Sequence, residues 1–117
     1  MYRRRSRNKY GNNPVEIMFK GEMTRFDSMK EATRAKELEF MEGSGLITDL
    51  QRQVKFEIRP GFYHNGKKIQ AETYKADFAY YENGEYVVED VKGVKTQVYR
   101  SKKNWMLYKY GIEIKET

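Results

Sequence analysis

The stretch YKADFAYYENGEYVVEDVK, residues 74–92, decides the fold that this sequence predicts. Asn83-Gly84 stands between two runs rich in apolar and aromatic residues. This dipeptide is the strongest short-range signal for a β-hairpin, because both residues of the tight turn must take positive φ. A two-residue loop places Asp77 directly opposite Asp90. We therefore expect two antiparallel strands, over residues 73–81 and 85–92, with two carboxylates facing each other.

These facing carboxylates are the first indication of function. Like charges opposite each other on paired strands repel, so the pair favours a bound cation, and a divalent metal ion is the usual candidate. Lys92 lies two residues beyond Asp90 on the same strand face. A carboxylate that holds a metal ion and a lysine that positions a water suit phosphodiester hydrolysis. The alternative is a solvent-exposed Asp77 beside an ordinary ion pair of Asp90 and Lys92.

A helix is expected upstream, over residues 29–42. The segment from Ser28 to Glu31 fits a capping box, and Gly43-Ser44-Gly45 ends the helix. One helix face is apolar, with Ala32, Ala35, Leu38 and Met41. Glu31 falls on this face, where a charge is costly without a partner. Glu31 therefore has two interpretations, a structural role in the capping box and a role in a site on the sheet.

Shorter elements flank this helix. Alternating residues predict a small hairpin over residues 15–26, around Lys20-Gly21, and a strand over residues 54–58 with one buried face. Asn65-Gly66 predicts a second tight hairpin turn. The single histidine, His64, lies beside that turn, and we expect it to face solvent.

The C-terminal part predicts a helix and a strand. Thr96 can cap a helix that runs to about Tyr110. Its expected core positions are Val98, Trp105 and Tyr108. Ile112 and Ile114 mark a short last strand. The whole order is helix, three antiparallel strands, helix, strand, which predicts an α/β fold with a mixed sheet flanked by helices.

Composition indicates a single globular domain and excludes several chemistries. The chain has 117 residues, of which 38% are hydrophobic, enough for one core. No apolar run approaches the roughly 18 residues of a membrane span, and we find no amphipathic anchor helix, so we expect no membrane partner. The absence of cysteine excludes disulfides and thiolate sites, and the single histidine disfavours histidine-based hydrolysis.

Positive charge is concentrated in two segments of a chain with net charge +6. We expect residues 1–14 to form a flexible basic arm before a single domain over residues 15–117. The basic residues of the arm are Arg3, Arg4, Arg5, Arg7 and Lys9. The second cluster contains Lys92, Lys95, Arg100, Lys102, Lys103 and Lys109, of which Lys95, Arg100, Lys102 and Lys103 are the expected DNA contacts. Such clusters favour a polyanion such as DNA, and the alternative for the arm is a solvated tail that only aids solubility.

Taken together, these residues resemble the PD-(D/E)xK nuclease superfamily. The resemblance rests on Asp77, the hairpin, Asp90-Val91-Lys92 and the helix-borne Glu31, and it covers residues 26–114. It implies a restriction-endonuclease-like core in the predicted order of elements. It also implies Glu31, Asp77 and Asp90 as ligands of Mg²⁺, for which Mn²⁺ can substitute. Lys92 is then the catalytic lysine, and Gln53 an accessory residue that orients a ligand or a phosphate.

A closer resemblance joins the segments FDSMKEA (26–32), QVKF (53–56), YKADF (74–78) and VEDVKG (88–93) to a small phage-encoded branch of this superfamily. That branch is similar to endonuclease subunits of heteromeric bacterial transposases and to small Holliday-junction resolvases. The resemblance implies an endonuclease selective for branched or recombining double-stranded DNA, in the cytoplasm of a bacterial host. Because one site cuts one strand, resolving a junction requires a homodimer. Two alternatives stay open: a non-catalytic nucleic-acid-binding module on the same scaffold, and a sequence-specific nicking nuclease.

Overall fold

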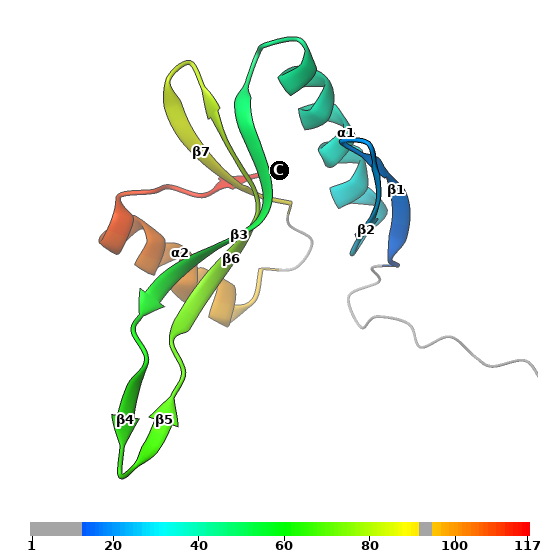
Figure 1. Ribbon diagram of the computed structural model, residues 1–117. Helices are drawn as coiled ribbons and strands as arrows, with labels where there is room; N and C mark the ends of the chain where they lie inside the picture. The colour runs from blue at the N-terminus through cyan, green and yellow to red at the C-terminus, as the bar shows by residue number, and fades with distance from the viewer. Residues whose placement is uncertain (1–12, 92–94) are drawn as a thin grey trace, which may run out of the picture.

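The computed structural model describes residues 13–91 and 95–117, which form a mixed α/β fold (Figure 1). Two helices, α1 (Met29–Gly43) and α2 (Gln97–Tyr110), lie on opposite sides of a central sheet. The strands in chain order are β1 (Val15–Phe19), β2 (Glu22–Phe26), β3 (Thr48–Arg59), β4 (Phe62–His64), β5 (Lys67–Ile69), β6 (Glu72–Glu82), β7 (Glu85–Asp90) and β8 (Lys115–Glu116). Neither helix of the described part is long and apolar enough to cross a membrane.

The central sheet contains four strands in the order β3-β6-β7-β8. The strands β3, β6 and β7 pair antiparallel, whereas β8 joins β7 in parallel after the crossover through α2. The expected α/β class, with a mixed sheet and two helices, is confirmed. The pairs β1–β2 and β4–β5 form separate two-stranded sheets around the turns expected at Lys20-Gly21 and Asn65-Gly66.

The hairpin between β6 and β7 has the predicted two-residue turn. Asn83 and Gly84 take φ of 53° and 78°, which places both in the left-handed region that this turn requires. The ladder extends from Glu82 opposite Glu85 to Phe78 opposite Glu89. The register counted from the sequence is therefore confirmed along this ladder.

Helix α1 turns its apolar face toward the sheet, as predicted. Ser28 caps it, because the Ser28 Oγ accepts a hydrogen bond of 3.1 Å from the Glu31 N–H. The buried residues of the helix are Glu31, Ala32, Ala35 and Leu38. The apolar ones belong to a core cluster that also contains Phe19, Phe26, Ile47, Leu50, Phe78 and Tyr80. This cluster joins α1 to the β1–β2 hairpin and to one face of β6.

Helix α2 has the predicted ends but turns a different face toward the sheet. Val98, Trp105 and Tyr108 are 63%, 47% and 83% exposed, and Tyr99 and Met106 are buried in their place. The predicted core positions are wrong by one residue, which is a rotation of about 100° around the helix axis. The physical reason is that the Tyr99 ring can pack while its hydroxyl donates to Glu116 at 2.6 Å, and that the flexible Met106 side chain fits the core.

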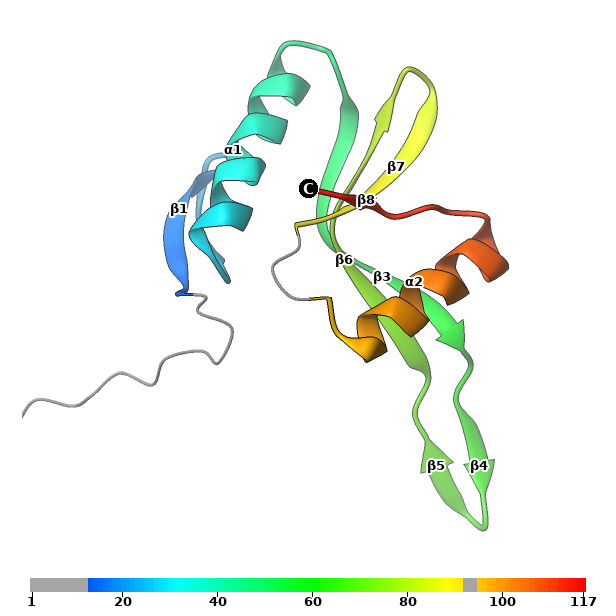
Figure 2. The same ribbon diagram turned by 180° about the vertical axis from the view of Figure 1, so that it is seen from behind.

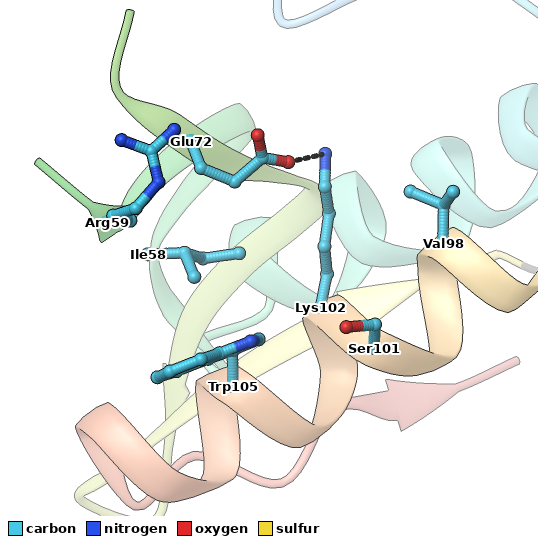
Figure 3. Close-up of a pocket in the computed structure, with 7 residues that line it drawn as sticks. All are labelled: Ile58, Arg59, Glu72, Val98, Ser101, Lys102 and Trp105. Atoms are coloured by element: carbon cyan, nitrogen blue, oxygen red, sulfur yellow. Dashed lines mark ion pairs between the residues drawn. The ribbon is translucent and has the colours of Figure 1, made fainter. Parts of the chain in front are cut away.

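The exposed side of α2 lines a pocket of about 380 Å³ beside the ends of β3 and β6 (Figure 3). Val98 and Trp105 contribute its helical wall, and Ile58 contributes the wall from β3. The last strand also differs from its prediction. Ile114 is buried, but the strand β8 comprises the two residues that follow it.

The two neighbouring faces of α2 can be separated by mutation. Met106→Ala should lower the free energy of unfolding by about 2–5 kcal/mol, because it opens a cavity in the core. Tyr108→Ala, on the exposed face of the same helix, should change it by less than about 0.5 kcal/mol. Urea unfolding followed by circular dichroism measures both values. A larger loss for Tyr108→Ala would contradict the observed helix rotation.

Candidate functional site

Polar residues form one row across the central sheet. The register of β3 and β6 places Gln53 across from Asp77, and that of β6 and β7 continues to Asp77 across from Asp90. Asp90 in turn pairs with Glu116 of β8. Gln53 takes φ of 54°, so the strand is locally irregular beside Asp77. The row of Gln53, Asp77, Asp90 and Glu116 therefore crosses all four strands.

Asp77 and Asp90 join β6 to β7 through their side chains. The Asp77 N–H donates to Asp90 Oδ1 at 3.1 Å, and the Val91 N–H donates to Asp77 Oδ2 at 2.8 Å. The Tyr74 hydroxyl donates to Asp90 Oδ2. Asp90 is only 2% exposed, whereas Asp77 is partly exposed. The two carboxylates are thus held as neighbours by hydrogen bonds that each accepts from the opposite strand.

Burial and neighbouring acids raise the pKa of Asp77. Burial and, after it, the negative charges of Asp90 and Glu31 together raise the pKa of Asp77 to about 8, against the hydrogen bond from Val91, which lowers it. Burial, followed by the hydrogen bond to Asp90, also raises the pKa of Tyr74. Clustered carboxyls with a raised pKa are typical of catalytic and metal sites, although structural networks can also produce them.

Glu31 reaches the same region from α1. Its Oε1 lies 3.6 Å from Arg52 Nη2 and 3.5 Å from Gln53 Nε2, both on β3. Burial, followed by the charge of Asp27, raises the pKa of Glu31, and Arg52 lowers it. The capping role and the site role expected for Glu31 therefore belong to different groups of the residue, its backbone and its side chain. Its backbone N–H completes the helix cap, while its side chain is 7% exposed and carries the carboxylate to Arg52 and Gln53 of the sheet.

The carboxylates fit a hard divalent cation by their chemistry more than by a preformed cage. Within residues 13–91 and 95–117, no group of three acidic or histidine side chains is placed to hold a metal ion. Glu31, Asp77 and Asp90 therefore do not form a complete three-carboxylate ligand set there. Mg²⁺, however, is usually held by one or two carboxylates together with waters and substrate phosphates. Asp77 and Asp90 could supply those two carboxylates.

The predicted cationic residues have different places. The predicted catalytic Lys92 lies outside the described residues, as do the arm residues Arg3, Arg4, Arg5, Arg7 and Lys9. Lys95 and Lys103 lie 3.1 and 3.3 Å from the carboxylate of Glu116, at the β8 end of the polar row. Hydrogen bonds from Tyr99, Lys95 and Lys103 lower the pKa of Glu116 to about 2.

The other two expected DNA contacts of the second basic cluster, Lys102 and Arg100, are elsewhere on α2. Lys102 lies 3.4 Å from Glu72, beside the α2 pocket (Figure 3), and Arg100 is exposed. The structure therefore brings Lys95 and Lys103 together at the polar row, but it does not bring Lys102 to the same place.

A buried ion pair that the sequence did not predict lies next to the row. Glu89 is fully buried, and Arg34 of α1 donates to both of its oxygens, from Nε at 2.6 Å and from Nη2 at 3.0 Å. The hydroxyls of Tyr80 and Thr117 donate to it at 2.6 and 3.1 Å. Burial raises the pKa of Glu89, but the hydrogen bonds from Arg34 and Tyr80 outweigh it and hold this pKa below its usual value.

This pair had only a weak signal in the sequence. Glu89 directly precedes Asp90, so the alternation of a strand sends the two carboxylates to opposite faces of the sheet. That alternation predicts an acid on the other face. Its partner Arg34 lies 55 residues away, and no local pattern relates the two.

The fold and the site define a small mixed α/β protein with a pair of facing carboxylates on the central strands of its sheet. A family described as "Protein of unknown function (DUF1064)" matches residues 7–117, and the chain belongs to this family. No curated protein and no solved structure matches the chain.

The buried and exposed contacts of Arg34 should differ strongly in their effect on stability. Arg34→Ala should lower the free energy of unfolding by about 3–5 kcal/mol, because it leaves the buried Glu89 without its cation. The matched variant Glu37→Ala removes only the exposed partner, 3.3 Å from Arg34 Nη1, and should cost less than about 1 kcal/mol. Urea unfolding measures both, and equal losses would contradict a structural role for the Arg34–Glu89 pair.

The raised pKa of Asp77 predicts how stability depends on pH. The carboxyl binds its proton more tightly in the folded chain, with a pKa of about 8, than at its ordinary value of 3.8. Its stabilising contribution is therefore complete below pH 3.8 and is lost as pH rises through about 8. Asp77→Asn removes this titration but keeps an oxygen to accept from Val91.

Melting temperatures measured in EDTA test this pH dependence. Relative to Asp77→Asn, the wild type should lose stability between about pH 4 and pH 8. Parallel curves for the two proteins would show that Asp77 titrates near its ordinary value.

Proposed function

We propose that the chain is a metal-dependent DNA endonuclease of the PD-(D/E)xK type, which hydrolyses phosphodiester bonds with an activated water. The order α1, β3, β6, β7, α2, β8 supports this, because it agrees with the helix, three strands, helix and strand described for that superfamily. The hairpin β4–β5 is then an insertion between the first two strands of a restriction-endonuclease-like core.

One observation carries the proposal: Asp77 and Asp90 face each other on the central strands, and Glu31 faces the same region from α1. In the motif, the first acid lies on one strand, and the second acid lies on the next strand two residues before the lysine. Asp77, Asp90 and Lys92 have this spacing in the sequence. A carboxyl whose pKa is raised by burial and by neighbouring acids, as that of Asp77 is, gains from a divalent cation, because the cation neutralises the repulsion.

Each residue then has a defined role. Asp77 and Asp90 bind Mg²⁺ or Mn²⁺, and a bound ion of this kind lowers the pKa of water and polarises the phosphoryl group. Lys92 orients the water and offsets negative charge that develops on the phosphate. Gln53 and Arg52 hold the Glu31 carboxylate toward the sheet, which keeps a third acid beside the pair.

The proposed substrate is branched or recombining double-stranded DNA, cut by a homodimer so that two strands are opened. A sequence-specific nicking nuclease would use the same carboxylates. A non-catalytic DNA-binding module is the second candidate, and one observation favours it: the described residues contain no group of three acidic or histidine side chains placed to hold a metal. Against it, a module that only binds DNA has no use for clustered acids near phosphates.

Cleavage of a labelled four-way junction with Mg²⁺ or Mn²⁺ tests the proposal. Asp77→Asn should lower the rate at least about 100-fold, since removal of a ligand costs more than removal of the groups that orient one. The matched control is Asp49→Asn on β3. Asp49 is exposed and has φ of 55°, a conformation that asparagine tolerates, so the control should cut as the wild type does.

Three outcomes would contradict a metal-dependent nuclease. These are cutting in EDTA, cutting retained by Asp77→Asn, and no cutting of any DNA by the wild type. Calorimetric titration with Mn²⁺ then separates the candidates. Uptake by the wild type that is lost in Asp77→Asn supports the metal site, and no uptake by the wild type supports the DNA-binding module.

A further inference from the structure

The hairpin β4–β5 is a ribbon that the core does not explain. All six of its strand residues are exposed, and they pair only with one another. Figures 1 and 2 show it projecting beyond the end of the central sheet, away from both helices. An isolated two-stranded hairpin gains little stability in water. A projecting ribbon with no buried side chain is therefore better explained by a partner than by packing.

The chemistry of the ribbon favours a polyanion. Residues 58–71 contain no acidic residue, although Glu57 and Glu72 stand directly on either side. The same segment carries three permanent positive charges, two exposed aromatic rings and the single histidine, contributed by Arg59, Lys67, Lys68, Phe62, Tyr63 and His64. Cationic and aromatic side chains without acids are the composition of surfaces that bind nucleic acid.

Both faces of the ribbon carry this chemistry. Residues opposite each other in an antiparallel pair share a face. Phe62 faces Ile69 and His64 faces Lys67 on one side, and Tyr63 faces Lys68 on the other. A hairpin that lies on a surface has one apolar and one polar face. A ribbon with an aromatic ring and a lysine on each face is suited to a groove, in which both faces contact the binding partner.

The base of the ribbon is held firmly. Arg59 donates to the Pro60 carbonyl at 2.8 Å and to the Gln70 carbonyl at 3.1 Å. These hydrogen bonds join the two segments of the hairpin where they leave the sheet. A Cβ at Gly61 would lie 3.0 Å from the Ile69 carbonyl oxygen, so the two segments of the hairpin approach each other closely there. The direction of the ribbon is therefore set by β3 and β6.

We propose that the β4–β5 ribbon inserts into the major groove of duplex DNA and holds the substrate of the carboxylate site. The major groove is about 12 Å wide and admits a two-stranded β-ribbon, whose faces then meet both walls. The identification of the DNA as a substrate rests on the proposed function. The contact between ribbon and groove does not depend on catalysis.

The ribbon lies within one turn of DNA of the carboxylate site. Ten residues lead from Lys67 through β6 to Asp77, which at about 3.3 Å per residue is at most about 33 Å. One turn of B-DNA measures about 34–36 Å. A duplex lying along β3 and β6 can therefore present a phosphate to the site and its major groove to the ribbon.

Positive charge continues between the ribbon and the carboxylate site. Lys75 lies two residues from Asp77, on the same face of β6, and is exposed. Lys55 of β3 is its direct partner across the ladder and is also exposed. Two like charges opposite each other repel unless an anion lies between or above them. A phosphate backbone that follows the strands toward the ribbon satisfies this condition.

A second copy of the chain is a less suitable partner for the ribbon than DNA. In a twofold dimer the same patch meets itself, so the acid-free ribbons would place Lys67 and Lys68 of one copy against the same residues of the other. That contact would bring like charges together with no acidic residue of the segment to offset them.

The decisive experiment removes the ribbon. Arg59 and Glu72 already pair across the ladder, so a chain in which Asn-Gly replaces residues 60–71 closes them with the turn used at positions 83–84. Fluorescence anisotropy in EDTA measures binding of the full chain to a labelled duplex of about three turns. We expect the ribbonless chain to lose at least tenfold in affinity with an unchanged melting temperature.

Point variants test the same contact if the ribbonless chain does not fold. Lys67→Ala/Lys68→Ala should lower the slope of log affinity against log salt by about 2, one for each lost phosphate contact. The control Lys36→Ala/Lys115→Ala removes the same charge from α1 and β8 and should lower the slope by less than half as much. Equal effects of the two pairs would show a general charge effect and overturn the proposal.

The remaining outcomes distinguish this inference from the proposed function. Unchanged binding after loss of the ribbon overturns the inference even if the wild type cuts DNA. A wild type that does not bind duplex DNA also overturns it. Ribbon-dependent binding without cleavage contradicts the nuclease and supports the ribbon. Loss of a dimer in light scattering, with DNA binding retained, assigns the ribbon to self-association instead.

Discussion

The fold depends on the hydrogen bonds by which Asp77 and Asp90 join β6 to β7. These two strands are the centre of the sheet, and their backbone ladder ends at Phe78 and Glu89. Beyond that point each carboxylate accepts an N–H from the opposite strand, so the polar backbone groups of Asp77 and Val91 keep their partners. The arrangement satisfies buried donors and at the same time brings two acids together. One set of contacts therefore pairs the strands and also places the carboxylates close enough to repel each other.

The strand β7 shows how environment separates two adjacent acids. Glu89 is enclosed by Arg34, Tyr80 and Thr117, and its pKa lies below the usual value. Its neighbour Asp90 faces the other side of the sheet, beside Asp77, where burial and the neighbouring carboxylates raise the pKa of Asp77. The first acid is part of the core, and its charge is matched by a rigid guanidinium. The second belongs to a group of carboxylates, which we propose as the site of a divalent cation.

Much of the site could be predicted from local patterns. The Asn83-Gly84 turn sets the register by which Asp77 faces Asp90, and the apolar spacing of α1 places Glu31 on the buried face. The pairing of Arg34 with Glu89 could not be predicted, because it joins residues 55 apart through a contact that only packing brings about. The core face of α2 was missed for a related reason. Val98 and Tyr99, like Trp105 and Met106, are adjacent and apolar enough that their pattern fits either rotation of the helix.

The sequence by itself determined the turns, the helix ends and the register of the central hairpin. These features follow from local rules, since positive φ, capping side chains and strand alternation act over a few residues. Only the tertiary structure decided which face of α2 is buried, which cation meets Glu89, and that β4–β5 projects from the sheet as a separate ribbon. These features depend on the shapes and charges of surfaces that come together from distant parts of the chain. Burial, which sets their free energy, is defined only when those surfaces meet.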